Sequence, residues 1–96
     1  MPPVVRLTDI ASGHGSFPPT NVIEASSDTI CNGLGVHRLG DAIQPHASPS
    51  PSPVHSRASA VASTDVTCNG RGVVRIGDAV NCGGILVTGS GNVLCD

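Results

Sequence analysis

The sequence has almost no aromatic residues: Phe17 is the single Phe, and there is no Trp and no Tyr. Large aromatic side chains supply much of the buried area in most domains, so this core must be built from Val, Ile, Leu and Ala. A chain of 96 residues also buries only a modest fraction of its surface. Small scaffolds of this kind usually need disulfides, a metal ion or a partner. We expect one domain over residues 1–96 that depends on such help.

Basic residues are few as well, with five Lys and Arg against seven Asp and Glu and a net charge of -2. Nucleic-acid binding needs a clustered basic surface, which this composition excludes. No apolar run approaches the roughly 18 residues of a transmembrane helix. The first residues, Met1 to Arg6, lack the basic and apolar regions of a signal peptide. We therefore expect the chain to be made and assembled in the cytoplasm.

Several catalytic and metal motifs are missing. The four Cys contain no C-x-x-C pair, which excludes the usual zinc-finger and zinc-ribbon patterns. In a cytoplasmic chain, such Cys favour free thiols or metal ligands over disulfides. No Ser lies in a Gly-x-Ser-x-Gly elbow, and no carboxylate pair stands in a pocket-forming context. These absences argue against an enzyme and against a small-molecule substrate.

What the sequence does contain is a repeat. Twelve Gly and eight Pro, with short Val, Ile and Thr-rich stretches between them, predict an all-β fold of strands and turns. "TICNGLGVHRLGDA" (29–42) and "VTCNGRGVVRIGDA" (66–79) are two copies of one unit. Counted from Asp28 and Asp65, 10 of 15 positions are identical. Each Asn-Gly between two short apolar runs predicts a β-hairpin with a type I′ turn.

A third copy is divided between the two ends of the chain. "SGNVLCD" (90–96) matches "STDVTCN" (63–69), and "VVRLTD" (4–9) matches "VVRIGD" (73–78). Placed end to end, the two terminal segments rebuild the unit, which closes a ring and removes exposed strand edges. The sequence therefore predicts a small pseudo-threefold fold of β-hairpin repeats. The Ser/Pro-rich stretch 47–57 interrupts this pattern, and we expect a long loop there.

Zinc-type ligands follow the Asp that ends each repeat by four or five residues. They are His14 after Asp9, His46 after Asp41 and Cys82 after Asp78. A closed structural zinc site takes four N or S ligands. His55, at the far end of the Ser/Pro-rich stretch, is the natural fourth. The set His14, His46, His55 and Cys82 thus predicts one structural zinc ion.

The remaining His and Cys have other expected roles. His37 stands where the other repeat has Val74, within a strand, and we interpret it as a surface residue. Three further Cys occupy equivalent strand positions just before the turns: Cys31, Cys68 and Cys95. We expect three small buried thiols around the axis. A disulfide between two of them is the alternative.

The turns and the ligand-bearing loops should lie at opposite ends of the molecule. Bringing three loops to one ion narrows that end, so we expect a cone with the metal near its vertex. The hairpin turns would form the base, and we expect them to bind a partner. The predicted partner-binding residues are Asn32, Gly33, Leu34, Asn69, Gly70 and Arg71.

The order of these motifs resembles the PAAR-repeat family, the proteins that tip the central spike of contractile phage tails and type VI secretion systems. The resemblance depends on Asp9 with Gly13-His14-Gly15, on the Asn-Gly and Arg-Leu/Ile-Gly-Asp repeats, and on the stretch 77–84. It implies a conical β fold with zinc held by three His and one Cys. It also implies a membrane-piercing tip, seated as a monomer on a trimeric β-helical spike and in transient contact with the target cell envelope. Such a tip is part of the phage virion or is secreted with the spike.

Carried onto this chain, the early-loop His of the family falls on His14 and the last Cys on Cys82. The family often has Cys-Pro-x-His after the middle Gly-Asp, where this chain has Gln44-Pro45-His46 without the Cys. Two other functions stay open at this level. A small zinc-dependent hydrolase would need an open coordination position and a general base, and neither is visible. A stand-alone binding module would use the Ser/Pro-rich stretch.

Overall fold

The computed structural model describes residues 1–15, 17–47 and 54–96, and these contain only strands, turns and irregular backbone. The strands are β1 (Ile10–Ala11), β2 (Thr20–Asn21), β3 (Ile30–Cys31), β4 (Leu34–Gly35), β5 (Ala42–His46), β6 (His55–Ala58), β7 (Thr67–Cys68) and β8 (Arg71–Gly72). The all-β prediction is confirmed for these residues. None of their segments is a helix long and apolar enough to cross a membrane.

The strands form four antiparallel pairs, each of two neighbours in the chain: β1–β2, β3–β4, β5–β6 and β7–β8. The two predicted Asn-Gly hairpins are β3–β4 and β7–β8. Asn32 and Asn69 have φ of 54° and 55°, and the glycines that follow them have φ of 80° and 79°. Two successive positive φ angles are those of a type I′ turn, which matches the twist of short strands.

A closed ring of backbone hydrogen bonds runs around the axis. Val5 N–H donates to Val74 O (2.9 Å), His37 N–H donates to Val5 O (3.0 Å), and Val74 N–H donates to His37 O (3.1 Å). These three residues hold the same position in the three copies of the repeat. The terminal copy is assembled from both ends, since Val4 N–H donates to Val93 O at 3.0 Å. The pseudo-threefold prediction, with one copy split between the termini, is confirmed.

Each copy ends in the same tight corner, in which an Arg pairs with the Asp three residues later. The Arg Nε to Asp Oδ2 distances are 2.9 Å for Arg6–Asp9, 2.7 Å for Arg38–Asp41 and 3.0 Å for Arg75–Asp78. The Asp also accepts a hydrogen bond from the backbone N–H of its Arg in every copy. Each corner therefore folds through contacts within four consecutive residues.

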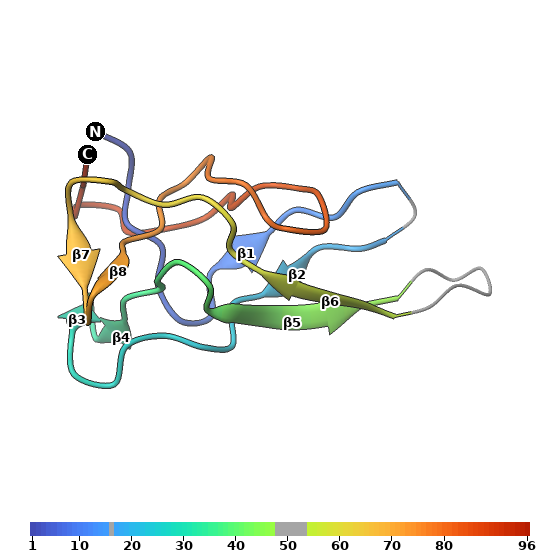
Figure 1. The fold of residues 1–96 in the computed structure, drawn as a ribbon, viewed down its shortest axis with the longest axis horizontal. Coiled ribbons are helices and arrows are strands. Elements are labelled where there is room, and N and C mark those ends of the chain that lie inside the picture. Colours follow the sequence, from blue (N-terminus) through green and yellow to red (C-terminus); the bar gives the residue numbers. More distant parts are fainter. Residues whose placement is uncertain (16, 48–53) are drawn as a thin grey trace.

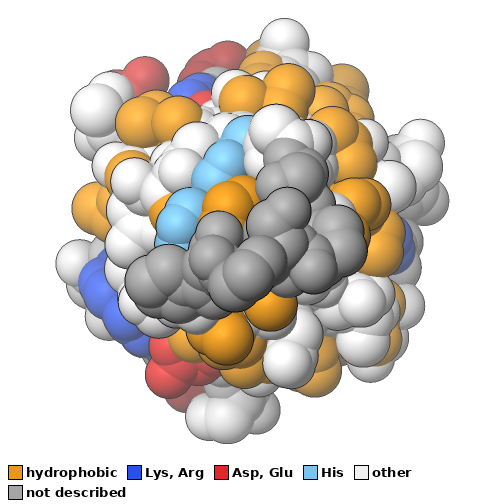
Figure 2. All heavy atoms as spheres, turned by 90° about the vertical axis from the view of Figure 1, so that its right-hand side faces the viewer, with side chains coloured by type: hydrophobic (Ala, Val, Ile, Leu, Met, Phe, Trp, Pro, Cys, Tyr) orange, Lys and Arg blue, Asp and Glu red, His pale blue; other side chains and the backbone are white. Residues whose placement is uncertain are grey.

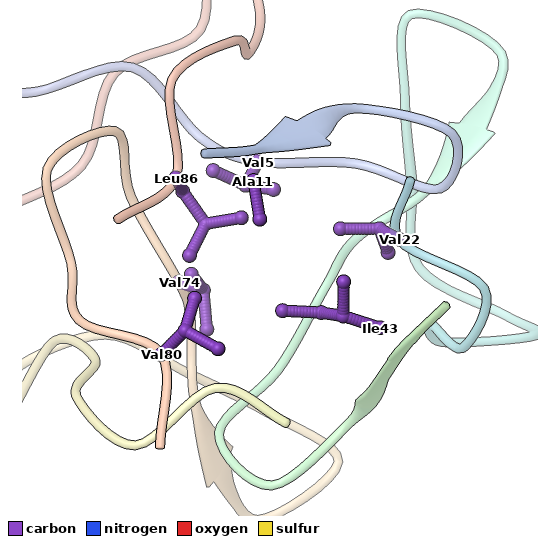
Figure 3. Close-up of a cluster of buried hydrophobic side chains, with 7 residues drawn as sticks. All are labelled: Val5, Ala11, Val22, Ile43, Val74, Val80 and Leu86. Atoms are coloured by element: carbon purple, nitrogen blue, oxygen red, sulfur yellow. The ribbon is translucent and has the colours of Figure 1, made fainter. Parts of the chain in front are cut away.

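The main core lies on the axis between the corners, and Figure 3 shows its small apolar side chains turned toward one another. Its members are Val5, Ala11, Val22, Ile43, Val74, Val80 and Leu86. His37 lies beside this core with 0 % of its surface exposed, so the prediction of a surface residue was wrong. The ring position that places Val5 and Val74 inside also places His37 inside. Its Nδ1 donates to Glu24 O (2.9 Å), and the hydroxyl of Ser59 donates to its Nε2 (2.7 Å).

The molecule is elongated, with principal extents of 39 × 23 × 23 Å. Figure 1 shows both termini and the hairpins β3–β4 and β7–β8 at one broad end, while β5 and β6 run toward a narrower end. The loop predicted over 47–57 ends before residue 55, because residues 55–57 belong to β6, which pairs with β5. Residues 48–53 of that predicted loop lie outside the described residues.

Candidate metal centre

Four side chains meet at the narrow end. One ligand atom from each of His14, His46, His55 and Cys82 lies within 4.8 Å of the others. Viewed onto this end, His side chains lie at the surface among apolar ones (Figure 2). The structure thus brings together the four residues that the sequence singled out, from segments that are as many as 68 positions apart (82 minus 14).

The β5–β6 ladder places two of the four. His46 and His55 are partners in its register, beyond an irregularity between Ile43 and His46. Facing positions in an antiparallel pair hold their side chains close together. The rings of His46 and His55 accordingly lie with centroids 5.4 Å apart. A strand register therefore sets this half of the group.

His14 comes from a tight turn that also contains Phe17. The two residues exchange backbone hydrogen bonds of 3.1 and 2.9 Å. The Phe17 ring stacks on the His55 ring with a centroid distance of 3.9 Å and an angle of 14°. The single aromatic residue of the chain thus packs against the His group. No local sequence pattern indicates this contact, because Phe17 packs against a residue on a distant strand.

Cys82 lies in the turn that follows the third corner. Gly83 N–H donates to Val80 O at 3.1 Å, and Gly83 has a φ of 111°, which a side chain would strain. A Cβ at Gly83 would also lie 3.2 Å from the His14 ring. Glycine at this position lets the loop approach His14, and Cys82 Sγ comes to 3.6 Å from His46 Nε2.

Two ring nitrogens in the group lack partners. His14 Nε2 and His55 Nδ1 are buried without a hydrogen bond in the described part of the chain. His46 Nδ1 donates to Pro18 O at 2.9 Å, which leaves its Nε2 free of hydrogen and directed at Cys82. A metal-bound His usually donates its other nitrogen in this way. Burying unpaired polar atoms is costly, so this donor set fits a metal ion.

The charge state of His14 suits the same role. Burial lowers the pKa of His14, and Coulombic interactions with His46, His55 and Arg57 lower it further. The neutral imidazole, which is the form that binds metals, is therefore favoured. Three His and one Cys supply four N and S donor atoms, which is the number that a closed structural zinc site takes.

The six residues predicted to bind a partner lie at the broad end, around the turns of β3–β4 and β7–β8. Nothing lies within 4 Å of a Cβ built on Gly33 or Gly70, so both turns face open space. Arg71 is less available, since its guanidinium pairs with the buried Asp41 at 2.8 Å. Asn32 and Asn69 hold the ring together, and their amides donate to Asn92 (2.9 Å) and Asp28 (3.0 Å).

Three equivalent thiols lie beneath these turns. Cys31, Cys68 and Cys95 are buried and free, as the sequence favoured. They form a second apolar cluster with Val4, Val36 and Val73. The alternative of a disulfide among them is not what the structure has.

Comparison with known families gives a match. The family model described as the PAAR motif matches residues 12–88, which include all four side chains of the candidate metal centre and both Asn-Gly hairpins. A comparison with curated protein sequences finds no match.

Proposed function

The chain belongs to the PAAR-motif family, and from that premise we propose that it is the tip of a contractile injection machine, capping the end of a trimeric β-helical spike. Membership of this family supports a spike-tip function in general terms. The proposal also includes a trimeric partner, a bound zinc ion and the piercing of a membrane.

The observation that carries the proposal is that the two ends of the molecule differ in shape and in the residues they present. The narrow end holds the His14, His46, His55 and Cys82 group, and the broad end carries the pseudo-threefold ring of hairpins (Figure 1). A single chain with three near-equivalent faces can meet the three chains of a symmetric trimer at once. A rigid narrow end then points away from the spike, toward the target envelope.

Zinc held by the four side chains would cross-link the loops of the narrow end. A bound structural zinc contributes its binding free energy to folding, which a core of small aliphatic side chains needs. Disulfides are another common support of a small domain. They are absent from the described residues, whose Cys are free. With these four side chains as donors, a zinc ion held here would have no open position for substrate. We therefore assign the metal a structural role and the chain no enzymatic one.

The test is to mix the purified chain with a trimeric β-helical spike protein from the same genome and measure the complex by native mass spectrometry. One chain per spike trimer is expected. Hydrogen–deuterium exchange should show new protection at β3–β4 and β7–β8 and none at β5–β6. Failure to bind any such spike would overturn the proposal. Protection confined to the narrow end would reverse the orientation and remove the piercing role.

A further inference from the structure

The broad end is hollow. A cavity of about 260 Å³ opens there, and the same positions of each repeat line it. Two of the triads that line it are Val4, Val36 and Val73, and Cys31, Cys68 and Cys95. No charged side chain lines it. Three copies of one mainly apolar wall, with Thr29 and Thr67 as its polar members, therefore surround the axis on the face opposite the four-residue group.

The floor of this hollow offers no free hydrogen-bonding group from its thiols. Cys31 Sγ donates to Asn32 Oδ1 and Cys68 Sγ to Asn69 Oδ1, both at 3.2 Å. Cys95 Sγ donates to Asp96 O at 3.4 Å. Apart from the hydroxyls of Thr29 and Thr67, the lining offers a polar occupant no side-chain group to replace its hydrogen bonds to water. The chemistry of the hollow thus selects an apolar occupant.

The rim is apolar and open to solvent. Ile30 is 58 % exposed and Leu94 is 50 % exposed, and both line the hollow at equivalent positions of different repeats. An engineered cavity of about 150 Å³ takes up benzene, so a hollow of about 260 Å³ has room for a small cluster of side chains. Covering such a rim would remove apolar surface from water.

We propose that this hollow is a socket for three apolar side chains, one from each chain of the threefold spike. The inference rests on the proposed function and names the contact that would hold the tip in place. The repetition of the lining argues for this occupant, because each chain of a trimer would meet an equivalent wall. The partner contact then involves the inner strand positions, Ile30 and Leu94, in addition to the Asn-Gly turns.

The test compares Ile30→Glu and Leu94→Glu with Ile23→Glu, a control at a side chain 49 % exposed and outside the hollow. An unpaired carboxylate at the socket should weaken spike binding at least about tenfold, because the charge cannot be buried among apolar groups at low cost. The control should bind like wild type, and all three variants should keep the same zinc content and melting temperature.

The outcomes separate this inference from the proposed function. If wild type binds no spike, the proposed function fails. If wild type binds and both socket variants bind equally well, the socket fails alone. A second copy of this chain is the other occupant to test, and sedimentation of the free chain detects it. A dimer that Ile30→Glu dissociates would assign the hollow to that second copy and overturn the inference.

A separate observation concerns Arg57 at the other end. Arg57 is 3 % exposed and forms no ion pair within the described ranges. Its guanidinium donates to Thr20 Oγ1 (2.9 Å), to Ser12 O, and to Gly83 O (3.3 Å), and its Nε is buried without a partner. Burying a cation that is held only by neutral oxygens costs free energy. The contacts of Arg57 therefore indicate that it has a role in positioning the segments around it.

Those contacts join three of the segments that carry the metal centre. Ser12 lies two residues before His14, Gly83 directly follows Cys82, and Arg57 itself lies two residues after His55 on β6. The flat guanidinium presents five donors in a fixed fork, whereas a Lys has a compact ammonium with three donors on a flexible stem. We infer that Arg57 is a positioning residue that holds the ligand-bearing loops at metal-binding spacing.

The test uses Arg57→Met and Arg57→Lys, with Arg71→Met as the matched Arg control at the broad end. Each variant is loaded with Zn²⁺ or Co²⁺ alone. Release of Zn²⁺ to a chelator should be at least about tenfold faster in both Arg57 variants, because the supporting contacts of a metal site typically change affinity by 10–100-fold. The Co²⁺ absorption bands should shift in the Arg57 variants and not in the control.

Two results would overturn the role of Arg57. Release rates and Co²⁺ spectra equal to wild type would show that the loops hold their spacing without it. Equal changes in Arg57→Met and Arg71→Met would show a general loss of stability. Absence of metal from wild type would instead contradict the zinc proposal itself.

Discussion

Cys82 Sγ lies 3.6 Å from His46 Nε2, although 36 residues separate them along the chain. Each residue follows the Asp corner of its own repeat, Asp78 or Asp41, and the closed ring turns both loops to the same end. The pairing is thus a consequence of the repeat itself. The four-residue group forms because three similar units, each with a candidate ligand after its corner, meet around one axis.

The first prediction concerns the metal. Protein purified without added metal should contain one zinc per chain by elemental analysis, because the donor set is complete. Cys82→Ala and His14→Ala should lose zinc and melt at lower temperature, since metal binding contributes to folding free energy. Cys68→Ser, at the opposite end, should keep its zinc. Zinc near zero in a folded wild-type chain would contradict the assignment.

The second prediction concerns pH and His37. Burial lowers the pKa of His37, partly offset by its hydrogen bond to Glu24 and by the charges of Asp41 and Glu24, while Arg38 lowers it further. Near pH 6.5, His37 therefore takes up a proton more readily in the unfolded chain than in the folded one. Protonation then favours the unfolded state, so the free energy of unfolding falls as the pH drops below that value. Urea unfolding at fixed excess zinc should show a smaller loss on acidification for His37→Val. An unchanged pH slope would mean that His37 does not contribute.

The third prediction concerns Thr8, which has a φ of 76° where the other two corners have Gly40 (83°) and Gly77 (93°). A β-branched residue in this left-handed region costs about 1–2 kcal/mol. Relief of this strain in Thr8→Gly should raise the free energy of unfolding by about 1 kcal/mol. The greater conformational entropy of glycine in the unfolded chain offsets part of that gain. Thr64→Gly, at an exposed position without positive φ, should not stabilise. Denaturant midpoints measure both.

The fourth prediction concerns Asp41, which has 0 % exposure and pairs with two guanidinium groups, Arg38 Nε at 2.7 Å and Arg71 at 2.8 Å. Asp41→Asn should lower the free energy of unfolding by about 1–3 kcal/mol, because it removes a fully buried carboxylate that accepts hydrogen bonds from two guanidinium groups and from the backbone N–H of Arg38. Asp65→Asn, at an exposed Asp, should change it by no more than about 0.5 kcal/mol. Chemical denaturation of both variants makes the comparison. Similar losses of unfolding free energy in Asp41→Asn and Asp65→Asn would show that the burial of Asp41 does not add to stability.

The sequence by itself determined the repeating parts of this protein. The Asn-Gly turns form through contacts within four residues, so their local pattern was sufficient to predict them. The split third copy then predicted the closed ring. His14, His46 and Cys82 followed from their place after each corner, and His55 from its place at the far end of the Ser/Pro-rich stretch.

Only the tertiary structure decided the contacts between distant segments. It placed His37 in the interior, extended β6 through His55, stacked Phe17 on that His, and aimed Arg57 at two ligand-bearing loops. None of these has a local pattern, because each depends on which segments the ring brings side by side. A side chain's burial and partners are set by packing in three dimensions, and spacing along the chain does not encode them.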